Sequence, residues 1–373
     1  MIELWTAARL LTPLETHATG AMTVEDGHIL AVGPRAAMAV PGGAQLRDFG
    51  DAVLAPGLVD IHVHGGGGYD LMSADAGAVA AVRRHLARHG VTTFLATTMT
   101  APWPATLASL ERLGRAGVDL HLEGPFLSPR QRGVHPPADL LLPRPEHLEQ
   151  LESAAQGRIR LITVAPELEG AEAFIAEASR RGICVSLGHS DADLAQARAG
   201  VRAGAHHVTH TFNAMRPLHH RDPGLLGEAL ANPDLSAEII ADGIHVHPAL
   251  VAMFLRLKNP GRAVLVSDGI SAAGRGDGSF ALGGITVEVT AGRCMANGHL
   301  AGSVLTLDQA VRNVVAWQGL DLAAAVRLAS LNPAQLVGLE RKGRLARGAD
   351  ADVIVLSAAG EVHETYVAGR KVD

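Results

Sequence analysis

Cysteine, lysine and aromatic residues are scarce in this chain of 373 residues. The two cysteines, Cys184 and Cys294, are too few for a disulfide framework, and Cys184 lies in an apolar run that is typical of a buried thiol. We therefore expect a reducing compartment. Lysine occurs only at positions 258, 342 and 371, and aromatic residues make up 3% of the chain. Alanine, glycine, valine and leucine dominate instead, a composition typical of tightly layered α/β packing.

The chain also lacks long apolar runs, a secretion signal and a strong excess of charge. No stretch approaches 18 uninterrupted apolar residues, which argues against a transmembrane helix. The segment Met1–Trp5 shows no basic region leading into an apolar one, as a secretion signal would. A formal net charge of −6 argues against nucleic-acid binding through a basic face. We expect a cytoplasmic protein that binds neither membrane nor nucleic acid.

Apolar, strand-like runs alternate with helical patterns from about residue 54 onward. The strand candidates are 57–64, 91–99, 117–124, 159–167, 182–189, 206–213, 236–243 and 263–269. Most of the segments between them have apolar residues at the 3.6-residue spacing of a helix. Eight strands with intervening helices predict an α/β fold with a (β/α)8, TIM-like barrel over residues 53–335. A glycine-rich segment near 274–302 predicts a β-hairpin excursion from this barrel.

The two ends of the chain have a different pattern. Residues 1–52 and 336–373 contain short alternating runs separated by turns, such as the Glu25–Gly27 turn. Neither end is large enough to bury a good core by itself. We therefore expect the two ends to pair into one small β-sandwich domain beside the barrel.

The segment Val59–His64, followed by four glycines, is the most informative part of the chain. Apolar residues alternate with His62 and His64, so a strand here would project both imidazoles from the same side. The glycines let the backbone turn sharply and leave both rings at the C-terminal end of the strand. Such a pair commonly presents nitrogen ligands to a divalent metal. The alternative is a histidine pair on a polar strand face.

Four later strand candidates also end in residues of the ligand type. Glu123 ends the third strand, His189 the fifth, His210 the sixth and Asp268 the eighth. In a parallel barrel these strand ends lie together at one end of the barrel, where the active site forms. Four imidazoles and two carboxylates at equivalent ends suit Zn²⁺ or a similar divalent ion. The sequence therefore predicts a metal centre at the barrel mouth.

Several of these segments resemble a known family. Pro56–His64 is similar to the opening motif of the metal-dependent amidohydrolase superfamily. Four further segments resemble its N-acetylglucosamine-6-phosphate deacetylase branch: His121–Phe126, Leu187–Ser190, Thr209–Met215 and Ser267–Gly269. The resemblance extends along the whole chain. It implies hydrolysis of the acetamide of N-acetyl-D-glucosamine 6-phosphate to D-glucosamine 6-phosphate and acetate, in amino-sugar catabolism or cell-wall recycling.

The resemblance also implies how metal is held. Glu123, His189 and His210 would bind the principal ion, most simply Zn²⁺. His62 and His64 would hold a second ion near Asp268, and the number of ions stays open. Many relatives bridge two metals with a carbamylated lysine at the end of strand 4, where this chain has Val164–Glu167 instead. Glu123 would therefore supply that carboxylate, and hydantoinase-like and dihydroorotase-like activities are disfavoured.

Two residues are expected to carry the chemistry. Asp268 can take a proton from the attacking water and then give it to the leaving amine. His135, in the segment Gly133–His135, resembles the family histidine that steadies the carbonyl oxygen. An ordinary loop histidine is the alternative for His135.

The substrate contacts are implied mainly by resemblance. Asn213 and Ala214 follow a metal ligand, and Arg221 and His245 resemble the family's phosphate and sugar contacts. Arg216, His219 and His220 lie near Arg221 and are alternatives to it. Ala301, Gly302 and Ser303 would approach the sugar through their backbone. Part of the phosphate clamp can come from a neighbouring subunit in this family, which implies a homodimer. His206, His207 and His247 are expected to be structural.

Three other functions compete with this one. The nearest is the same reaction on the galactosamine epimer. An N-acyl amino acid deacylase is disfavoured because the loop from Asn213 to Arg221 resembles a phosphate site. A catalytically silent metal-binding scaffold is disfavoured because it would have no use for the proton shuttle Asp268.

Overall fold

The chain forms two compact units, and each one draws on separate stretches of the sequence. A computed structural model describes residues 1–372. The first unit holds residues 1–60, 83–93 and the chain from 306 onward, and the second holds residues 61–82 and 94–305. The six strand-end residues predicted to form a metal centre all fall in the second unit.

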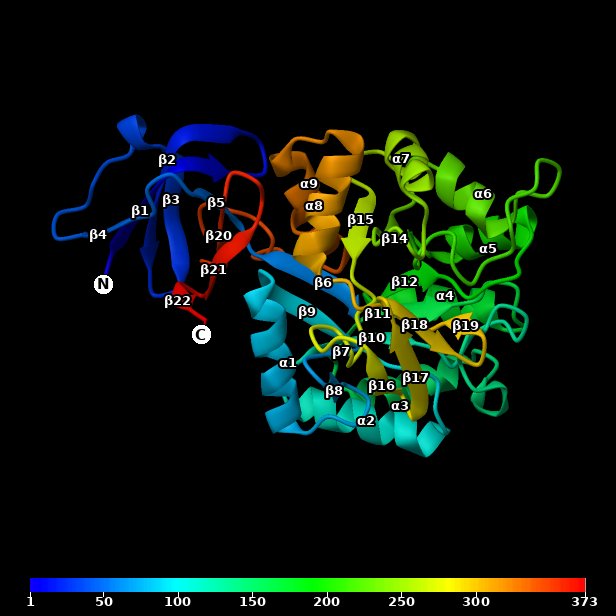
Figure 1. The fold of residues 1–373 in the computed structure, drawn as a ribbon. Coiled ribbons are helices and arrows are strands. Elements are labelled where there is room, and N and C mark those ends of the chain that lie inside the picture. The colour runs from blue at the N-terminus through cyan, green and yellow to red at the C-terminus, as the bar shows by residue number, and fades with distance from the viewer. Residues whose placement is uncertain (373) are drawn as a thin grey trace. The chain divides into compact units, whose positions relative to one another are not determined.

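The first unit contains a sheet to which both ends of the chain contribute. Its eight strands within the described residues are β1 (Glu3–Leu11), β2 (Thr16–Glu25), β3 (His28–Pro34), β4 (Gln45–Asp48), β5 (Val53–Pro56), β20 (Val353–Leu356), β21 (Val362–Val367) and β22 (Arg370–Lys371). They follow the order β22-β21-β20-β5-β1-β2-β3, with β4 beside β1 (Figure 1). The two ends join where β5 pairs antiparallel with β20. That this sheet makes a β-sandwich stays a prediction.

An aromatic cluster forms part of the core of the first unit. Trp5 is fully buried, and its ring lies 4.7 Å from that of Tyr366, which comes from the other end of the chain. The guanidinium of Arg47 covers the Trp5 ring at 5.1 Å. The unit also contains the helices α8 (Leu307–Gln318), α9 (Leu322–Leu328) and α10 (Leu331–Leu336), together with the short helix η1 (Arg35–Ala37).

Most residues of a curled parallel sheet fall within the second unit. Six strands follow the order β13-β12-β11-β10-β9-β6 among the described residues: β6 (Leu58–Val63), β9 (Val91–Thr97), β10 (Asp119–Glu123), β11 (Ile159–Val164), β12 (Cys184–Leu187) and β13 (His207–Val208). Two further parallel strands, β14 (Ala237–Ile240) and β15 (Ala263–Val266), pair with each other. Most residues of these strands are buried, as expected where helices cover a parallel sheet.

A few backbone hydrogen bonds link the strand pair β14–β15 to both edges of the larger sheet. Thr211 N donates to Glu238 O at 2.9 Å, which brings β14 beside the end of β13. At the other edge, Asp268 N donates to His62 O at 2.9 Å, and His64 N donates to Gly269 O at 2.8 Å. The carboxyl ends of the strands therefore face a common region.

Helices separate the successive parallel strands. They are α1 (Ala76–Arg88), α2 (Trp103–Arg115), α3 (Pro145–Ala154), α4 (Ala171–Arg180), α5 (Leu194–Ala203), α6 (Gly224–Ala231) and α7 (Pro248–Leu257), with the short η2 (Pro137–Asp139) before α3. Helix α5 shows how the sequence sets a helix start. Asp193 accepts from Gln196 N at 2.8 Å while Gln196 Oε1 accepts from Asp193 N at 3.0 Å, a complete capping box.

An antiparallel sheet follows β15, in the region where the sequence predicts a hairpin excursion. It consists of β16 (Gly278–Leu282), β17 (Ile285–Thr290), β18 (Arg293–Ala296) and β19 (His299–Leu300), and the short pair β7 (Gly65–Gly66) and β8 (Tyr69–Asp70) lies elsewhere in this unit. The buried side chains of Val287, Val289 and Cys294 pack with Ile270 and Ala301. Cys184 and Cys294 are both buried free thiols. Across residues 1–372, every helix is too short or too polar to cross a bilayer.

Candidate metal centre and active site

Six buried side chains converge from the carboxyl ends of five strands. They form two groups among the described residues: Glu123, His189 and His210, and His62, His64 and Asp268. Within each group one potential ligand atom per residue lies within 4.8 Å of the others. The structure thus brings together all six residues that the sequence marks as strand-end ligands.

The backbone turns sharply at three of these residues. His189, His210 and Asp268 have φ angles of 47°, 22° and 51°, values that residues other than glycine rarely adopt. Each of the three lies two residues beyond the end of its strand. Strained backbone of this kind concentrates at functional sites, where the surrounding structure holds it in place. Here it accompanies the turn of each side chain into the site.

The geometry of the first group fits a cation. Glu123 Oε1 lies 3.2 Å from His189 Nε2 and 3.1 Å from His210 Nε2, and the two imidazole nitrogens are 3.1 Å apart. His189 Nδ1 lies 2.8 Å from the carbonyl oxygen of Gln131, which can only accept, so Nδ1 carries the proton. The lone pair of a neutral His189 Nε2 therefore points at an acceptor and at a second imidazole. A divalent ion between these three atoms would satisfy all of them.

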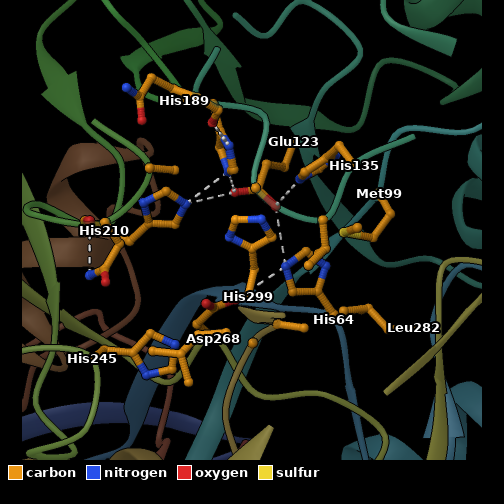
Figure 2. Close-up of a pocket in the computed structure, with 18 of the residues that line it drawn as sticks. His64, Met99, Glu123, His135, His189, His210, His245, Asp268, Leu282 and His299 are labelled. Carbon is orange, nitrogen blue, oxygen red and sulfur yellow. Dashed lines mark hydrogen bonds and ion pairs between the residues drawn. The ribbon is translucent and has the colours of Figure 1, made fainter. Parts of the chain in front are cut away.

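The second group lies directly beside the first. Asp268 Oδ1 is 3.2 Å from His64 Nε2 and 3.5 Å from His62 Nε2. The carboxylate of Glu123 also reaches this group, since its Oε1 lies 3.4 Å from His62 Nε2 and its Oε2 lies 3.4 Å from His64 Nε2. Figure 2 shows Glu123 between the imidazoles of His64 and His189. Glu123 is therefore placed to serve both groups.

The charges of this cluster are strongly coupled. Burial alone would raise the pKa of Glu123, but nearby imidazoles, led by His62, lower it well below its usual range. Burial would likewise raise the pKa of Asp268, and His62 and His64 lower it. Burial lowers the pKa of His64, but Asp268 and Glu123 raise it to about 9. Both carboxylates are therefore ionised at neutral pH and able to accept a proton or bind a cation.

His135 has a defined tautomer. Its Nδ1 accepts the backbone N–H of Thr100 at 3.2 Å, so a neutral ring carries its proton on Nε2. Burial, the largest effect, lowers the pKa of His135 to about 4 and keeps the ring neutral. Nε2 lies 3.5 Å from Glu123 Oε2. His135 thus directs a neutral N–H donor into the site.

A cavity of about 300 Å³ opens above the two groups (Figure 2). Its wall contains His64, Glu123, His189, His210 and Asp268, together with these other predicted site residues: His135, Asn213, Ala214, His245, Ala301 and Gly302. His245 Nδ1 lies 2.7 Å from Asp242 Oδ2. Burial lowers the pKa of His245, but the Asp242 carboxylate raises it above its usual value, so the ring gains positive character. This character suits an anionic ligand.

Two predicted substrate residues lie outside the cavity wall. Ser303 is buried and supports the backbone around Asp268. Its N–H donates to Asp268 O at 2.8 Å, and its Oγ donates to Ser267 O at 2.6 Å. Arg221 is exposed, and its Nη1 lies 2.8 Å from His220 Nε2. Arg221 is therefore not part of the cavity wall of its own chain.

Sequence reasoning missed several residues of the cavity wall. They are Met99, Arg130, Gln131, Gly133, Val134, Leu282, His299 and Leu300. Four of them belong to the loop between Glu123 and His135. Since that loop joins two candidate residues, its position along the chain was a usable signal. His299 and Leu300 similarly precede the predicted contact Ala301.

Comparisons with known proteins agree with this geometry. The amidohydrolase family profile matches residues 53–372. The chain belongs to the amidohydrolase family. The resemblance inferred from the strand-end motifs is therefore confirmed.

Relatives extend the comparison to a branch of this family. The N-acetylglucosamine-6-phosphate deacetylase of Bos taurus is 40% identical over 348 residues, which cover 87% of this chain and 85% of that protein. The N-acetylgalactosamine-6-phosphate deacetylase of Escherichia coli O157:H7 is 37% identical, with 98% of this chain and 97% of that protein covered. A solved variant of the Mycobacterium smegmatis N-acetyl-D-glucosamine-6-phosphate deacetylase, in complex with N-acetyl-D-glucosamine-6-phosphate, superimposes with a TM-score of 0.94 at 36% identity. That match covers 100% of this chain and 99% of the other.

Proposed function

We propose that this amidohydrolase removes the acetyl group from N-acetyl-D-glucosamine 6-phosphate, releasing D-glucosamine 6-phosphate and acetate. One observation carries the proposal: two neighbouring histidine–carboxylate groups, one with Glu123 and the other with Asp268, lie at a cavity. The relatives of this chain are deacetylases of phosphorylated amino sugars. The galactosamine epimer is the second candidate substrate, because a relative whose alignment covers 98% of this chain is named an N-acetylgalactosamine-6-phosphate deacetylase.

The metal is proposed to be Zn²⁺, held first by Glu123, His189 and His210. His62, His64 and Asp268 form the place for a second ion. The nitrogen and oxygen ligands of both groups suit zinc, and the proton held on His189 Nδ1 leaves its Nε2 available as a ligand. When bound, a divalent cation would activate water and polarise the amide carbonyl.

Asp268 is proposed to move the proton. Its ionised carboxylate takes a proton from the water that attacks the carbonyl carbon. It then delivers that proton to the amide nitrogen as the carbon–nitrogen bond breaks, so the amine leaves neutral together with acetic acid, which gives up its own proton to solvent and becomes acetate. His135 donates its Nε2–H to the carbonyl oxygen as negative charge develops there. The hydrogen bond from Thr100 N supports this role, because it holds the proton of His135 on the nitrogen that faces the cavity.

The substrate would lie in the cavity with its phosphate away from the metal groups. Asn213, Ala214 and His245 are proposed to contact the phosphate, and Ala301 and Gly302 the sugar, with Ser303 supporting their loop. Arg221 lies outside this cavity, so we propose that it completes the phosphate clamp of a second copy in a homodimer. The positive character of His245 supports the phosphate assignment.

The remaining architectural predictions are part of the same proposal. We infer that residues 53–335 close into a (β/α)8 barrel, and the bonds that join β14 and β15 to both edges of the six-stranded sheet support this. Residues 1–52 and 336–373 would form the small β-sandwich domain. Two free, buried cysteines support a reducing compartment, which we take to be the cytoplasm.

Acetate release from a panel of N-acetyl sugars tests the proposed function. The panel holds the 6-phosphates of N-acetylglucosamine and N-acetylgalactosamine, the two free sugars and an N-acetyl amino acid. We expect the glucosamine 6-phosphate derivative to be the best substrate by kcat/KM. Preference for the galacto 6-phosphate would select the second candidate. Preference for the N-acetyl amino acid would refute the proposal.

A further inference from the structure

One fully buried carboxylate beside the metal groups has no part in the proposed reaction. Glu238, on β14, has an exposed fraction of 0%. Its Oε1 lies 2.7 Å from His62 Nδ1 and accepts the backbone N–H of His210 at 2.9 Å. Its Oε2 lies 3.3 Å from His207 Nε2. A buried charge is costly unless it is paired and hydrogen-bonded, and here both oxygens have partners.

The contact with His62 decides which nitrogen of that ring can bind a metal. A carboxylate is an acceptor, so His62 Nδ1 carries a proton, and in a neutral ring His62 Nε2 therefore keeps the lone pair that a metal ion needs. That Nε2 faces Asp268 Oδ1 at 3.5 Å and Glu123 Oε1 at 3.4 Å. The ring of His121 packs edge-on against His62 at 4.6 Å and restricts its tilt, but such packing cannot select a tautomer.

The same oxygen also touches the first metal group. Glu238 Oε1 accepts the N–H of His210, and the Glu238 carbonyl accepts the N–H of Thr211 at 2.9 Å. His210 is held in a turn with a φ of 22°, so these bonds fix a backbone that is otherwise unfavourable. Glu238 therefore connects a side chain of one group to the backbone of the other.

We propose that Glu238 is a positioning residue that holds His62 in the Nδ1–H tautomer, so that the second ion can bind beside the first. This inference rests on the proposed metal centre. Carboxylates behind a ligating histidine typically strengthen metal affinity by 10- to 100-fold. The first ion depends less on the charge of Glu238, because its ligand His189 is oriented by the carbonyl of Gln131 and the N–H of His210 needs only a neutral acceptor at position 238.

Metal titration of a Glu238→Gln variant tests the inference. Glutamine keeps the shape and can still accept a hydrogen bond, but it is neutral and also offers an NH2 donor, so it no longer forces the proton of His62 onto Nδ1. Metal-free protein is titrated with Zn²⁺ against a chromophoric chelator, and bound zinc is counted by elemental analysis. We expect two ions in the unsubstituted chain. In Glu238→Gln, the second should bind about 10- to 100-fold more weakly, and the first should change by less than about threefold.

Glu228→Gln is the matched control. Glu228 is also buried, with Arg198 Nε and Asn232 Nδ2 each 2.9 Å from its carboxylate, but it lies on α6 away from both groups. This variant should bind both ions normally. The thermal stability of each metal-free protein is measured in parallel, since a purely structural role for Glu238 would lower stability and weaken both ions alike.

Three results would overturn the inference: unchanged affinity for the second ion in Glu238→Gln, equal weakening of both ions, or a single ion in the unsubstituted chain. If Glu238→Gln does not fold, the unsubstituted protein is loaded with zinc, labelled with nitrogen-15 at its histidines and studied by NMR. We expect a proton on His62 Nδ1, and its absence would contradict the proposal. Zinc binding is measured without substrate. A protein that binds zinc as expected but shows no activity would therefore count against the proposed function and not against the role of Glu238.

Discussion

Asp308 offers a quantitative test of how the first unit is held together. It lies in the first turn of α8, buried, with Arg312 Nη1 at 2.7 Å and His89 Nδ1 at 3.3 Å. Burial raises the pKa of Asp308, but the nearby side chains of His89, Thr306 and Arg312 outweigh it and lower the pKa from 3.8 to about 2. The amino end of a helix also favours a negative charge.

The shift converts directly into stability. Because the folded pKa lies below the unfolded one, the charged carboxylate stabilises the fold above pH 3.8. That contribution is lost as the pH falls through about 2. A shift of nearly two units corresponds to about 2 kcal/mol. Asp308→Asn keeps the shape and removes the charge, so it should lower the free energy of unfolding by about 2 kcal/mol at pH 7. The deficit should shrink steadily below pH 4.

Urea unfolding of metal-free protein, followed by circular dichroism between pH 7 and pH 2.5, measures this. The metal-free form is used because acid would otherwise also release the ion. Asp51→Asn is the control, since Asp51 is exposed and should change stability by less than about 0.5 kcal/mol. A deficit that stays constant with pH, or no deficit at pH 7, would refute the reasoning.

The active site yields three further predictions. The variants Glu123→Ala and His210→Ala should each lose the first ion and, with it, the activity. His62→Ala should lower the activity less if one ion suffices. Full zinc content in Glu123→Ala or His210→Ala would contradict the ligand assignment. Asp268→Asn should lower kcat by roughly 10² to 10⁴ with substrate binding largely kept, and near-normal turnover would exclude the proton-shuttle role. Arg221→Ala should lower kcat/KM for the 6-phosphate by roughly 10- to 150-fold and leave the slow reaction on free N-acetylglucosamine unchanged. Arg216→Ala is the comparison, because Arg216 is paired with Asp191 and Asp222 and its loss should depress both reactions alike.

The convergence of the six candidate ligands could be predicted from the sequence because each of them ends or closely follows an apolar run. His62 and His64 show the two-residue period of a strand, and Glu123, His189, His210 and Asp268 follow the runs that become β10, β12, β13 and β15. Parallel strands bring such ends together, so position along the chain was enough to place the side chains in one region.

The supporting contacts could not be read in the same way. The carbonyl of Gln131 and the N–H of Thr100 come from loops, and which imidazole they meet depends on how those loops fold. Glu238 did leave a signal, because a charged residue within the apolar run Ala237–Ile240 needs a buried partner. His207 was expected to be structural, and its contact with Glu238 places it behind the site. The proposed role of Arg221 would depend on a second chain, which no pattern within one chain specifies.

Acetate release during a zinc titration tests the central claim most directly. Metal-free protein is supplied with N-acetylglucosamine 6-phosphate, and turnover is followed as Zn²⁺ is added up to two equivalents. The account predicts no turnover without metal and a rise that is largely complete once the group of Glu123, His189 and His210 is filled. Full turnover in chelator-treated protein that elemental analysis shows to be free of metal would contradict it.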